Sequence, residues 1–208
     1  MQLPESLPAR VYLAAFDTER DRLTGRTWLA YALRSAALAD LRLSGHIVDE
    51  NGRVAPGTER HEPRDPVLRH VWSEVVAAPG RRWRSLVGAN RRTTKDAVTG
   101  QLDDGGWVQV DRPATWWRRS RVTVRDARAV GRVKEQVAAS LRSPMPIERL
   151  AATDVALIAV LAVAEIRTAI SKEQKREHGA RIKSAIAAGG PPIDALKHAI
   201  AQARANRS

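Results

Sequence analysis

The longest apolar run of the chain, LAATDVALIAVLAVAEIRTAI at residues 150–170, constrains the fold more than any other segment. From Val155 to Ala164 the run contains no polar side chain. A helix that is apolar on every side must be buried inside a protein or lie in a membrane. Crossing a bilayer takes about 20 consecutive apolar residues, and Asp154 and Glu165 close this run too early. The run therefore predicts a buried helix at about 150–170, at the centre of a soluble α-helical domain.

Helical spacing of apolar residues recurs along most of the chain. Thr27 to Leu43 places leucine or alanine every four residues, which is typical of a helix. The isoleucines after Ile166 predict that helix continues to Gly189. The expected fold class is mainly α, with a flexible N-terminus at 1–6, one globular helical domain at 7–202 and a frayed C-terminus at 203–208.

Two segments predict β-hairpins instead. At about 46–55, short apolar pairs flank Asn51-Gly52, and this dipeptide supplies the positive φ angles of a two-residue turn. At about 107–124, two alternating segments, WVQV and RVTV, flank the loop DRPATWWRRS. The order of helix followed by hairpin thus occurs twice.

The charge of the chain is strongly positive and unevenly distributed. The formal net charge is +12, and the segment from Arg81 to Arg142 alone carries 15 basic and 6 acidic residues. Such clustering favours binding to a polyanion, either nucleic acid or an anionic membrane surface. The alternative is charge that only maintains solubility in an arginine-rich proteome. The 29 arginines against 6 lysines suggest a high-GC bacterium, and the N-terminus lacks the pattern of a signal peptide, so we expect a cytoplasmic protein.

The sequence gives little support to an enzyme. It has no cysteine, no glycine-rich phosphate loop and no pair of histidines at metal-ligand spacing on one helix. The five histidines are scattered, and no acid–base pair stands out. We therefore expect neither catalytic residues nor a bound metal or cofactor.

Three basic residues need an explanation. Arg34 lies in an otherwise apolar helical segment, so its guanidinium must reach water, a carboxylate such as Asp40, or a ligand. Arg92 and Lys95 are three residues apart and share one helix face. A guanidinium beside an ammonium suits a phosphate monoester, although a solvated basic face is the simpler alternative.

Two adjacent tryptophans, Trp116 and Trp117, precede Arg118 and Arg119 in the loop of the second hairpin. Exposed indole rings favour insertion at a membrane interface or contact with a second copy of the chain, with the arginines on lipid headgroups or acidic partners. Alternatively, one of the two rings belongs to the core.

Three segments together resemble the Golgi phosphoprotein 3 family, which includes a eukaryotic Golgi peripheral membrane protein and bacterial homologues. They are ALRSAALADLRLSGHI followed by a hairpin, RRTTKDAVTGQLDDGGWV, and RLAATDVALIAVLAVAEI. Their order and spacing agree with the family from about Leu7 to Ile200. The resemblance implies a mainly α-helical domain, binding of phosphatidylinositol 4-phosphate on a basic face, and a projecting hairpin for membrane contact or oligomerisation.

The resemblance also implies a set of headgroup-binding residues. The family uses a tryptophan, a basic residue on the following helix, and an Arg-x-x-Arg pair, which fall on Trp28, Arg34, Arg92 and Lys95. The lysine keeps the charge but loses the planar fork of arginine. Since a Golgi role does not transfer to a bacterium, the lipid is expected to be a phosphoinositide or another anionic phospholipid.

The leading hypothesis is thus a non-catalytic peripheral membrane protein that grips an anionic phospholipid headgroup on the cytoplasmic face of a membrane. It could also form homo-oligomers through the second hairpin, or act as an adaptor that recruits client proteins. The alternative is a winged-helix-type nucleic-acid-binding protein, since helix-then-hairpin order and basic charge fit both classes. Arg92–Asp104 is then the candidate recognition helix, because Thr27–Leu43 is too apolar to read base edges.

Overall fold

The computed structural model of the chain describes residues 3–25, 27–59, 61–111 and 121–206. Helices dominate these residues, which confirms the expected mainly α fold class. The helices are α1 (Leu7–Ala14), α2 (Leu29–Leu43), α3 (Pro66–Ala77), α4 (Trp83–Gly88), α5 (Arg91–Asp104), α6 (Ala127–Arg142), the 3₁₀ helix η1 (Ile147–Arg149), α7 (Ala152–Val163), α8 (Lys172–Glu177), α9 (Gly179–Ala188) and α10 (Pro191–Ala205).

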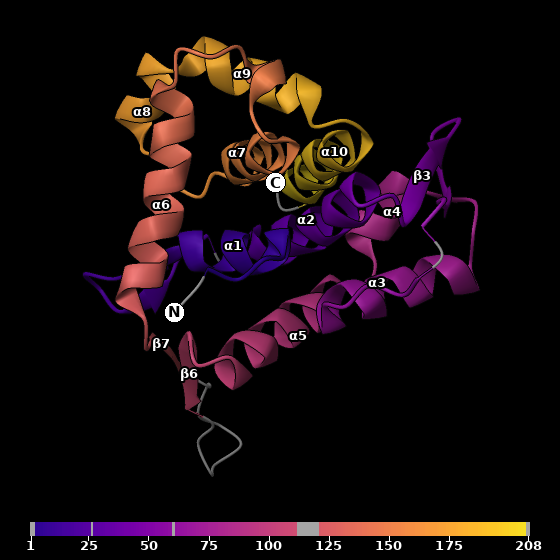
Figure 1. Cartoon of the computed structure of the whole chain (residues 1–208), viewed down its shortest axis with the longest axis horizontal. Helices are drawn as coiled ribbons and strands as arrows, with labels where there is room; N and C mark the ends of the chain where they lie inside the picture. The colour runs from indigo at the N-terminus through magenta and orange to yellow at the C-terminus, as the bar shows by residue number, and fades with distance from the viewer. Residues whose placement is uncertain (1–2, 26, 60, 112–120, 207–208) are drawn as a thin grey trace.

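The helices are arranged in tiers, with α2 in the middle (Figure 1). On one side of α2 lie α7 and α10, and on the other side lie α3 and α5. Helix α1 packs beside α2, and α4 also contacts it. More helices therefore pack around α2 than around α7, although α7 is the more apolar of the two. The alanine-rich composition of α2 explains this position, because small side chains let several helices approach closely.

Helix α7 is buried as expected but is shorter than the apolar run that predicts it. The residues from Val155 to Leu161 are all buried, whereas the helix ends at Val163. Glu165 then adopts a left-handed conformation with φ of 55°. The N–H of Ile166 donates to the carbonyl of Leu161, which satisfies a carbonyl at the helix end. This C-terminal cap turns the chain away from the helix axis before residue 170.

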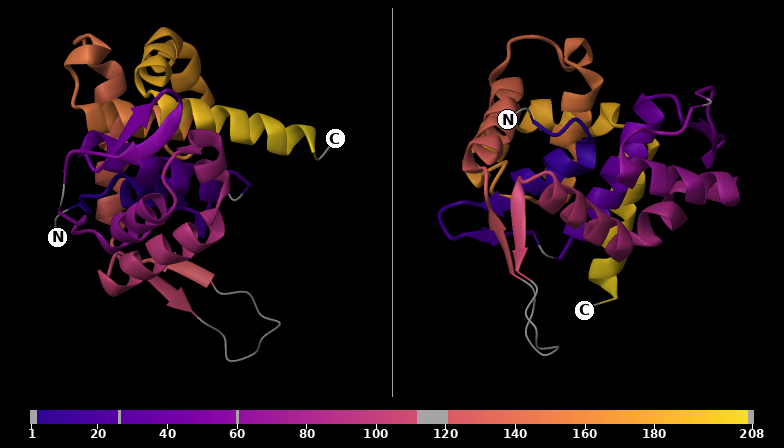
Figure 2. Two further views of the ribbon diagram at one scale, coloured as in Figure 1. Left: turned by 90° about the vertical axis from the view of Figure 1, so that its right-hand side faces the viewer. Right: turned by 60° about the horizontal axis from the view of Figure 1, so that its bottom comes forward.

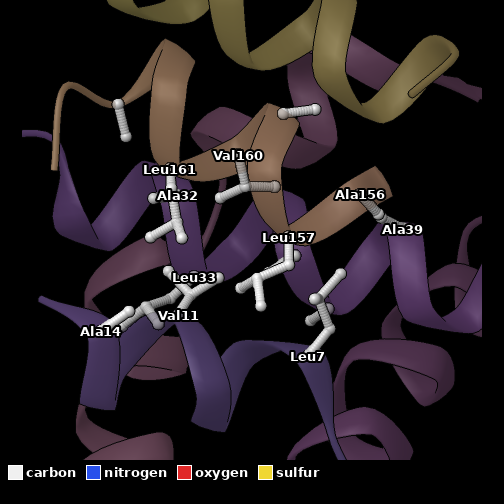
Figure 3. Packing of buried hydrophobic residues seen from close by; sticks show 14 of the residues in the cluster. Leu7, Val11, Ala14, Ala32, Leu33, Ala39, Ala156, Leu157, Val160 and Leu161 are labelled. Carbon is white, nitrogen blue, oxygen red and sulfur yellow. The ribbon is translucent and has the colours of Figure 1, made fainter. Parts of the chain in front are cut away.

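The core joins α1, α2 and α7. Figure 3 shows aliphatic side chains from these three helices meeting in one layer, with Ala156 of α7 next to Ala39 of α2. Leu33 and Leu157 are at most 1% exposed. Burying a leucine contributes about 1.5–3 kcal/mol, so this layer is a principal source of the stability of the fold.

The expected continuous helix after Ile166 is wrong. The chain instead forms two short helices, α8 and α9, separated at His178. Ser171 starts α8 with a capping box, in which its hydroxyl accepts from the N–H of Gln174 and the Gln174 side chain accepts from the N–H of Ser171. The cap forces a new helix to begin five residues after Ile166, so isoleucine spacing across it does not describe one helix.

Both expected hairpins are present. Strands β3 (Ile47–Glu50) and β4 (Arg53–Pro56) pair antiparallel around Asn51-Gly52, and both turn residues have positive φ. A third short strand, β5 (Arg81–Arg82), adds to β4. The second hairpin pairs β6 (Val108–Asp111) with β7 (Arg121–Val124).

A further hairpin, β1 (Phe16–Asp17) with β2 (Arg22–Leu23), has no counterpart among the expectations. Strand β2 contacts β7, so this small hairpin lies beside the second one. Figure 1 and Figure 2 show that the β6–β7 hairpin projects from one end of the molecule, opposite the end formed by α8 and α9. In the described part of the chain, no helix has the length and apolar character needed to cross a bilayer.

Candidate functional site

A large hollow lies where the two small hairpins meet α5. Its volume is about 810 Å³, and its walls come from the β1–β2 hairpin, the start of α2, one face of α5, and the β6–β7 hairpin. Segments from residue 12 to residue 122 thus converge on one place. The basic residues of its lining are Arg20, Arg22, Lys95 and Arg121.

Carboxylates neutralise some of these cations more closely than others. The Arg121 guanidinium lies 3.1 Å from Asp21, and that of Arg20 lies 3.5 Å from Asp17. Lys95 approaches its neighbour Asp96 only to 3.9 Å and keeps 41% of its side chain exposed. Arg22 is exposed at the end of the turn. Lys95 and Arg22 are therefore the cations of the hollow best placed to meet an anion.

Tyr12 of α1 also forms part of the lining of the hollow. Its side chain is buried, and its phenolic oxygen accepts a hydrogen bond of 3.2 Å from the Thr99 hydroxyl. Burial raises the pKa of the Tyr12 phenol above its ordinary value. The phenol therefore keeps its proton at neutral pH, and because Tyr12 is 0% exposed it supports the hollow without opening to it.

Arg34 does not line this hollow. Its side chain is 0% exposed and lies between α2 and three other helices. Its Nε donates to the carbonyl of Leu86 at 3.0 Å, one terminal nitrogen donates to the Thr94 hydroxyl at 3.3 Å, and the other pairs with Glu74 at 2.5 Å. A charge in this position is matched by a carboxylate and by hydrogen bonds, as buried charges require.

The partner of Arg34 is Glu74 of α3, so the interpretation that pairs it with Asp40 is wrong. Asp40 instead accepts the N–H of Leu7 at 2.7 Å, at the start of α1. Through its three partners, Arg34 ties α2 to α3, α4 and the first turn of α5. The side chain thereby fixes the position of Lys95, which follows Thr94 directly.

Trp28 belongs to a cluster of aromatic and basic groups near the starts of α2 and α5. Its half-buried ring lies 6.3 Å from that of Tyr31, and the guanidinium of Arg204 lies 5.5 Å above it. Tyr31 in turn carries the guanidinium of Arg91 at 4.3 Å. Cations over aromatic faces are attracted by the ring quadrupole. Arg92, next to this cluster, is exposed on the surface of α5.

A comparison with protein families decides the relationship of the chain. The family model described as Golgi phosphoprotein 3 (GPP34) matches residues 7–203. The chain belongs to the Golgi phosphoprotein 3 family. This is a family of peripherally membrane-associated proteins that bind phosphoinositide lipids, and it is not a family of enzymes. Among curated proteins, none matches the chain.

The four residues that the resemblance predicts to bind a headgroup have different environments in the structure. Lys95 lines the hollow, Arg92 is exposed beside the cation–aromatic cluster, Trp28 is half-buried within that cluster, and Arg34 is enclosed in the core. Only Lys95 of the four contributes to the 810 Å³ hollow. The other cations of the hollow come from the two hairpins.

The hairpin residues expected to contact a membrane or a second copy, Trp116, Trp117, Arg118 and Arg119, lie outside the described residues. The strands that carry this loop do line the hollow, through Val110, Arg121 and Val122.

Sequence reasoning did not select Arg20 and Arg22. The segment from Asp17 to Arg22 reads only as a charged turn, and its strands contain two residues each. Such short strands give no detectable alternation. The available signal is weaker: a charged turn with two arginines directly after the apolar segment of α1, which the fold brings next to α5.

Proposed function

We propose that this member of the Golgi phosphoprotein 3 family is a peripheral membrane protein that binds an anionic phospholipid headgroup in the hollow beside Lys95. The observation that supports this proposal most is the convergence of Lys95 and Arg22 on a space of about 810 Å³. Two cations match the negative charge and the acceptor oxygens of a phosphate group.

Each group has a distinct role in this proposal. The Lys95 ammonium acts as a point charge on the phosphate, whereas the planar guanidinium of Arg22 can donate two parallel hydrogen bonds. Arg34 is a positioning residue, because it holds the start of α5 in place from inside the core. Trp28 and Arg92 provide a neighbouring contact with the headgroup region of the bilayer.

The second hairpin completes the proposed membrane-binding surface. Its strands form one wall of the hollow, so a lipid headgroup in the hollow places the loop between β6 and β7 at the same bilayer. Indole rings favour the membrane–water interface, and arginines favour anionic headgroups. In this arrangement Trp116 and Trp117 enter the interface while Arg118 and Arg119 contact phosphates. Contact between two copies through this hairpin, and recruitment of client proteins to the cytoplasmic face of a membrane, extend the same proposal.

The structure does not favour the nucleic-acid alternative. Helix α5 followed by the β6–β7 hairpin has the order of a winged helix, but α5 presents Asp96 and Asp104 among its exposed residues. Carboxylates on a recognition helix repel DNA phosphates. Because phosphate contacts supply a large share of the affinity for DNA, these carboxylates weaken binding.

Liposome co-sedimentation tests the proposal. Removing two cations that each contribute about 1 kcal/mol should weaken binding to anionic vesicles roughly 30-fold. The test variant is Arg22→Ala/Lys95→Ala, with vesicles containing a phosphoinositide and, separately, vesicles of phosphatidylcholine alone. Arg92→Ala/Lys95→Ala tests the pair that the family resemblance implies.

The matched control is Arg176→Ala/Lys183→Ala, which removes the same charge from exposed positions on α8 and α9, at the opposite end of the molecule. This control should bind nearly as well as the wild type. Equal losses in the control and in Arg22→Ala/Lys95→Ala would show that only net charge matters, and the site assignment would then be wrong.

A further inference from the structure

An exposed ion pair joins the two hairpins that form walls of the hollow beside Lys95. Arg121, the first residue of β7, donates from one terminal nitrogen to the carboxylate of Asp21 at 3.1 Å. Asp21 lies in the turn between β1 and β2, 100 positions earlier in the chain. Both residues line the hollow. The pair therefore places a carboxylate on one of the cations that surround the proposed headgroup site.

The Asp21 carboxylate is not needed to hold its own turn. Asp17 holds the turn instead, because its carboxylate accepts the N–H groups of Glu19 and Arg20, each at 3.2 Å. In the described part of the chain, the partner of the Asp21 carboxylate is Arg121. The backbone of Asp21 is left-handed, with φ of 44°, which aspartate and asparagine tolerate better than most residues. The carboxylate can therefore lose Arg121 while the turn keeps its shape.

The bond between the two side chains is easily exchanged. The Arg121 side chain is 68% exposed and that of Asp21 is 44% exposed, so water and salt weaken their attraction. The guanidinium uses only one terminal nitrogen on Asp21. A phosphate group can accept two parallel hydrogen bonds from a guanidinium, which is the stronger arrangement. A phosphate in the hollow is thus a better partner for Arg121 than Asp21 is.

We propose that Arg121 is a third ligand of the bound phosphate, and that Asp21 occupies its guanidinium until the phosphate displaces it. This inference rests on the proposed function, since it adds a residue to the same site. Asp21 then acts as an internal competitor that lowers the affinity for anionic headgroups. The hairpins stay together after the exchange, because β2 also contacts β7.

Asp21→Asn tests the competition. Asparagine keeps the shape of the side chain and tolerates the left-handed backbone, but it carries no charge. Liposome co-sedimentation with phosphatidylcholine vesicles that contain a phosphoinositide should show about two- to fivefold tighter binding, the gain expected from releasing an exposed ion pair. The matched control is Glu135→Gln. It removes the carboxylate of another exposed ion pair, with Arg142 at 2.7 Å on α6, and neither residue lines the hollow.

The double variant Asp21→Asn/Arg121→Gln distinguishes a phosphate ligand from a passive ion pair. It leaves the net charge unchanged, so removing a passive pair would leave the affinity unchanged. If Arg121 binds the phosphate, the double variant loses that contact and should bind about fivefold more weakly than the wild type. Glu135→Gln/Arg142→Gln is the charge-neutral control and should bind as the wild type does. Circular dichroism verifies that each variant is folded.

The inference is overturned if Asp21→Asn binds no tighter than Glu135→Gln, or if the double variant binds as well as the wild type. Arg22→Ala/Lys95→Ala separates these results from failure of the proposed function. If that variant binds as well as the wild type, the headgroup site is wrong, and the role of Arg121 is wrong with it. If it loses binding while the variants at Asp21 and Arg121 change nothing, the site stands without Arg121.

Discussion

Arg34 carries a charge inside the core, and its stability there depends on Glu74. Removing one partner of a buried ion pair leaves an uncompensated charge and costs about 3–5 kcal/mol. We expect Glu74→Ala to lower the free energy of unfolding by about 3 kcal/mol. This is the lower end of that range, because the Glu74 side chain is itself 16% exposed. Urea denaturation followed by circular dichroism measures this change.

The control for this prediction is Glu177→Ala, which removes an exposed carboxylate from α8 and should change stability by less than about 0.5 kcal/mol. The double variant Arg34→Met/Glu74→Ala should lose less than the sum of the two single losses, because the charge that Glu74 compensates is absent. Strict additivity would contradict the pairing.

Asp40 favours folding more as the pH falls, which is the opposite of the usual effect of a carboxyl group. Burial raises the pKa of its carboxyl above the ordinary 3.8, and this outweighs the N–H of Leu7, which favours the ionised form. The folded state therefore holds the proton more tightly than the unfolded state does, so this group favours folding below its unfolded pKa. Its contribution is lost as the pH rises through the folded pKa.

Asp40→Asn should remove this dependence while still accepting the N–H of Leu7. We expect the variant to be more stable than the wild type at pH 7, with the difference shrinking as the pH falls toward 3.8 and below it. Thermal denaturation across this pH range measures both proteins. A difference that grows on acidification would mean that the pKa is lowered instead.

At the scale of single residues, the sequence identifies which side chains need partners but not the partners themselves. Arg34 stands out because it interrupts an apolar segment. Its carboxylate is 40 positions away on α3, and nothing in the periodicity of α2 indicates which helix faces it. For the same reason, the sequence selects Lys95 but not the two arginines of the β1–β2 hairpin, which only tertiary folding brings to α5.

Helices and strands with strong local signals could be predicted, whereas those set by caps could not. The Asn51-Gly52 turn specifies its hairpin, and the apolar residues of α7 specify its burial. The early end of α7 depends on the left-handed conformation of Glu165, a residue type that gives no such signal. The break between α8 and α9 depends on the capping box at Ser171, whose effect is stronger than that of the isoleucine spacing.

Close packing around α7 leads to a prediction at the scale of elements. Ala159 is 0% exposed, and a Cβ placed on Gly189 at the end of α9 would lie 3.4 Å from the Ala159 Cβ. Ala159→Leu has no space for the added carbons, so α9 must shift. Overpacking of this kind costs about 1–3 kcal/mol. Urea denaturation should show this loss, whereas Ala180→Leu, at an exposed position on α9, should show almost none.

For the whole molecule, charge alone does not distinguish the two ends. The hollow and the β6–β7 hairpin lie at one end, and α8 with α9 lies at the other (Figure 2). The segment 172–188, which contains α8 and α9, also carries five basic and two acidic residues. Anionic membranes attract basic residues only within about a Debye length. Charge alone therefore does not orient the protein on a membrane, and the proposed binding site predicts that the end with the hollow faces the bilayer.

This orientation predicts that binding to anionic vesicles weakens as salt is added, but does not disappear at high salt. Raising the NaCl concentration from about 0.1 M to about 1 M shortens the Debye length from about 10 Å to about 3 Å, so co-sedimentation with vesicles of phosphatidylserine and phosphatidylcholine should fall steeply. Indole insertion is not screened by salt, so the wild type should retain weak binding at high salt that Trp116→Ala/Trp117→Ala loses. At low salt the same variant should still bind, because its cations are intact. If the wild type and this variant are released together at high salt, the loop does not enter the bilayer and the attachment is electrostatic only.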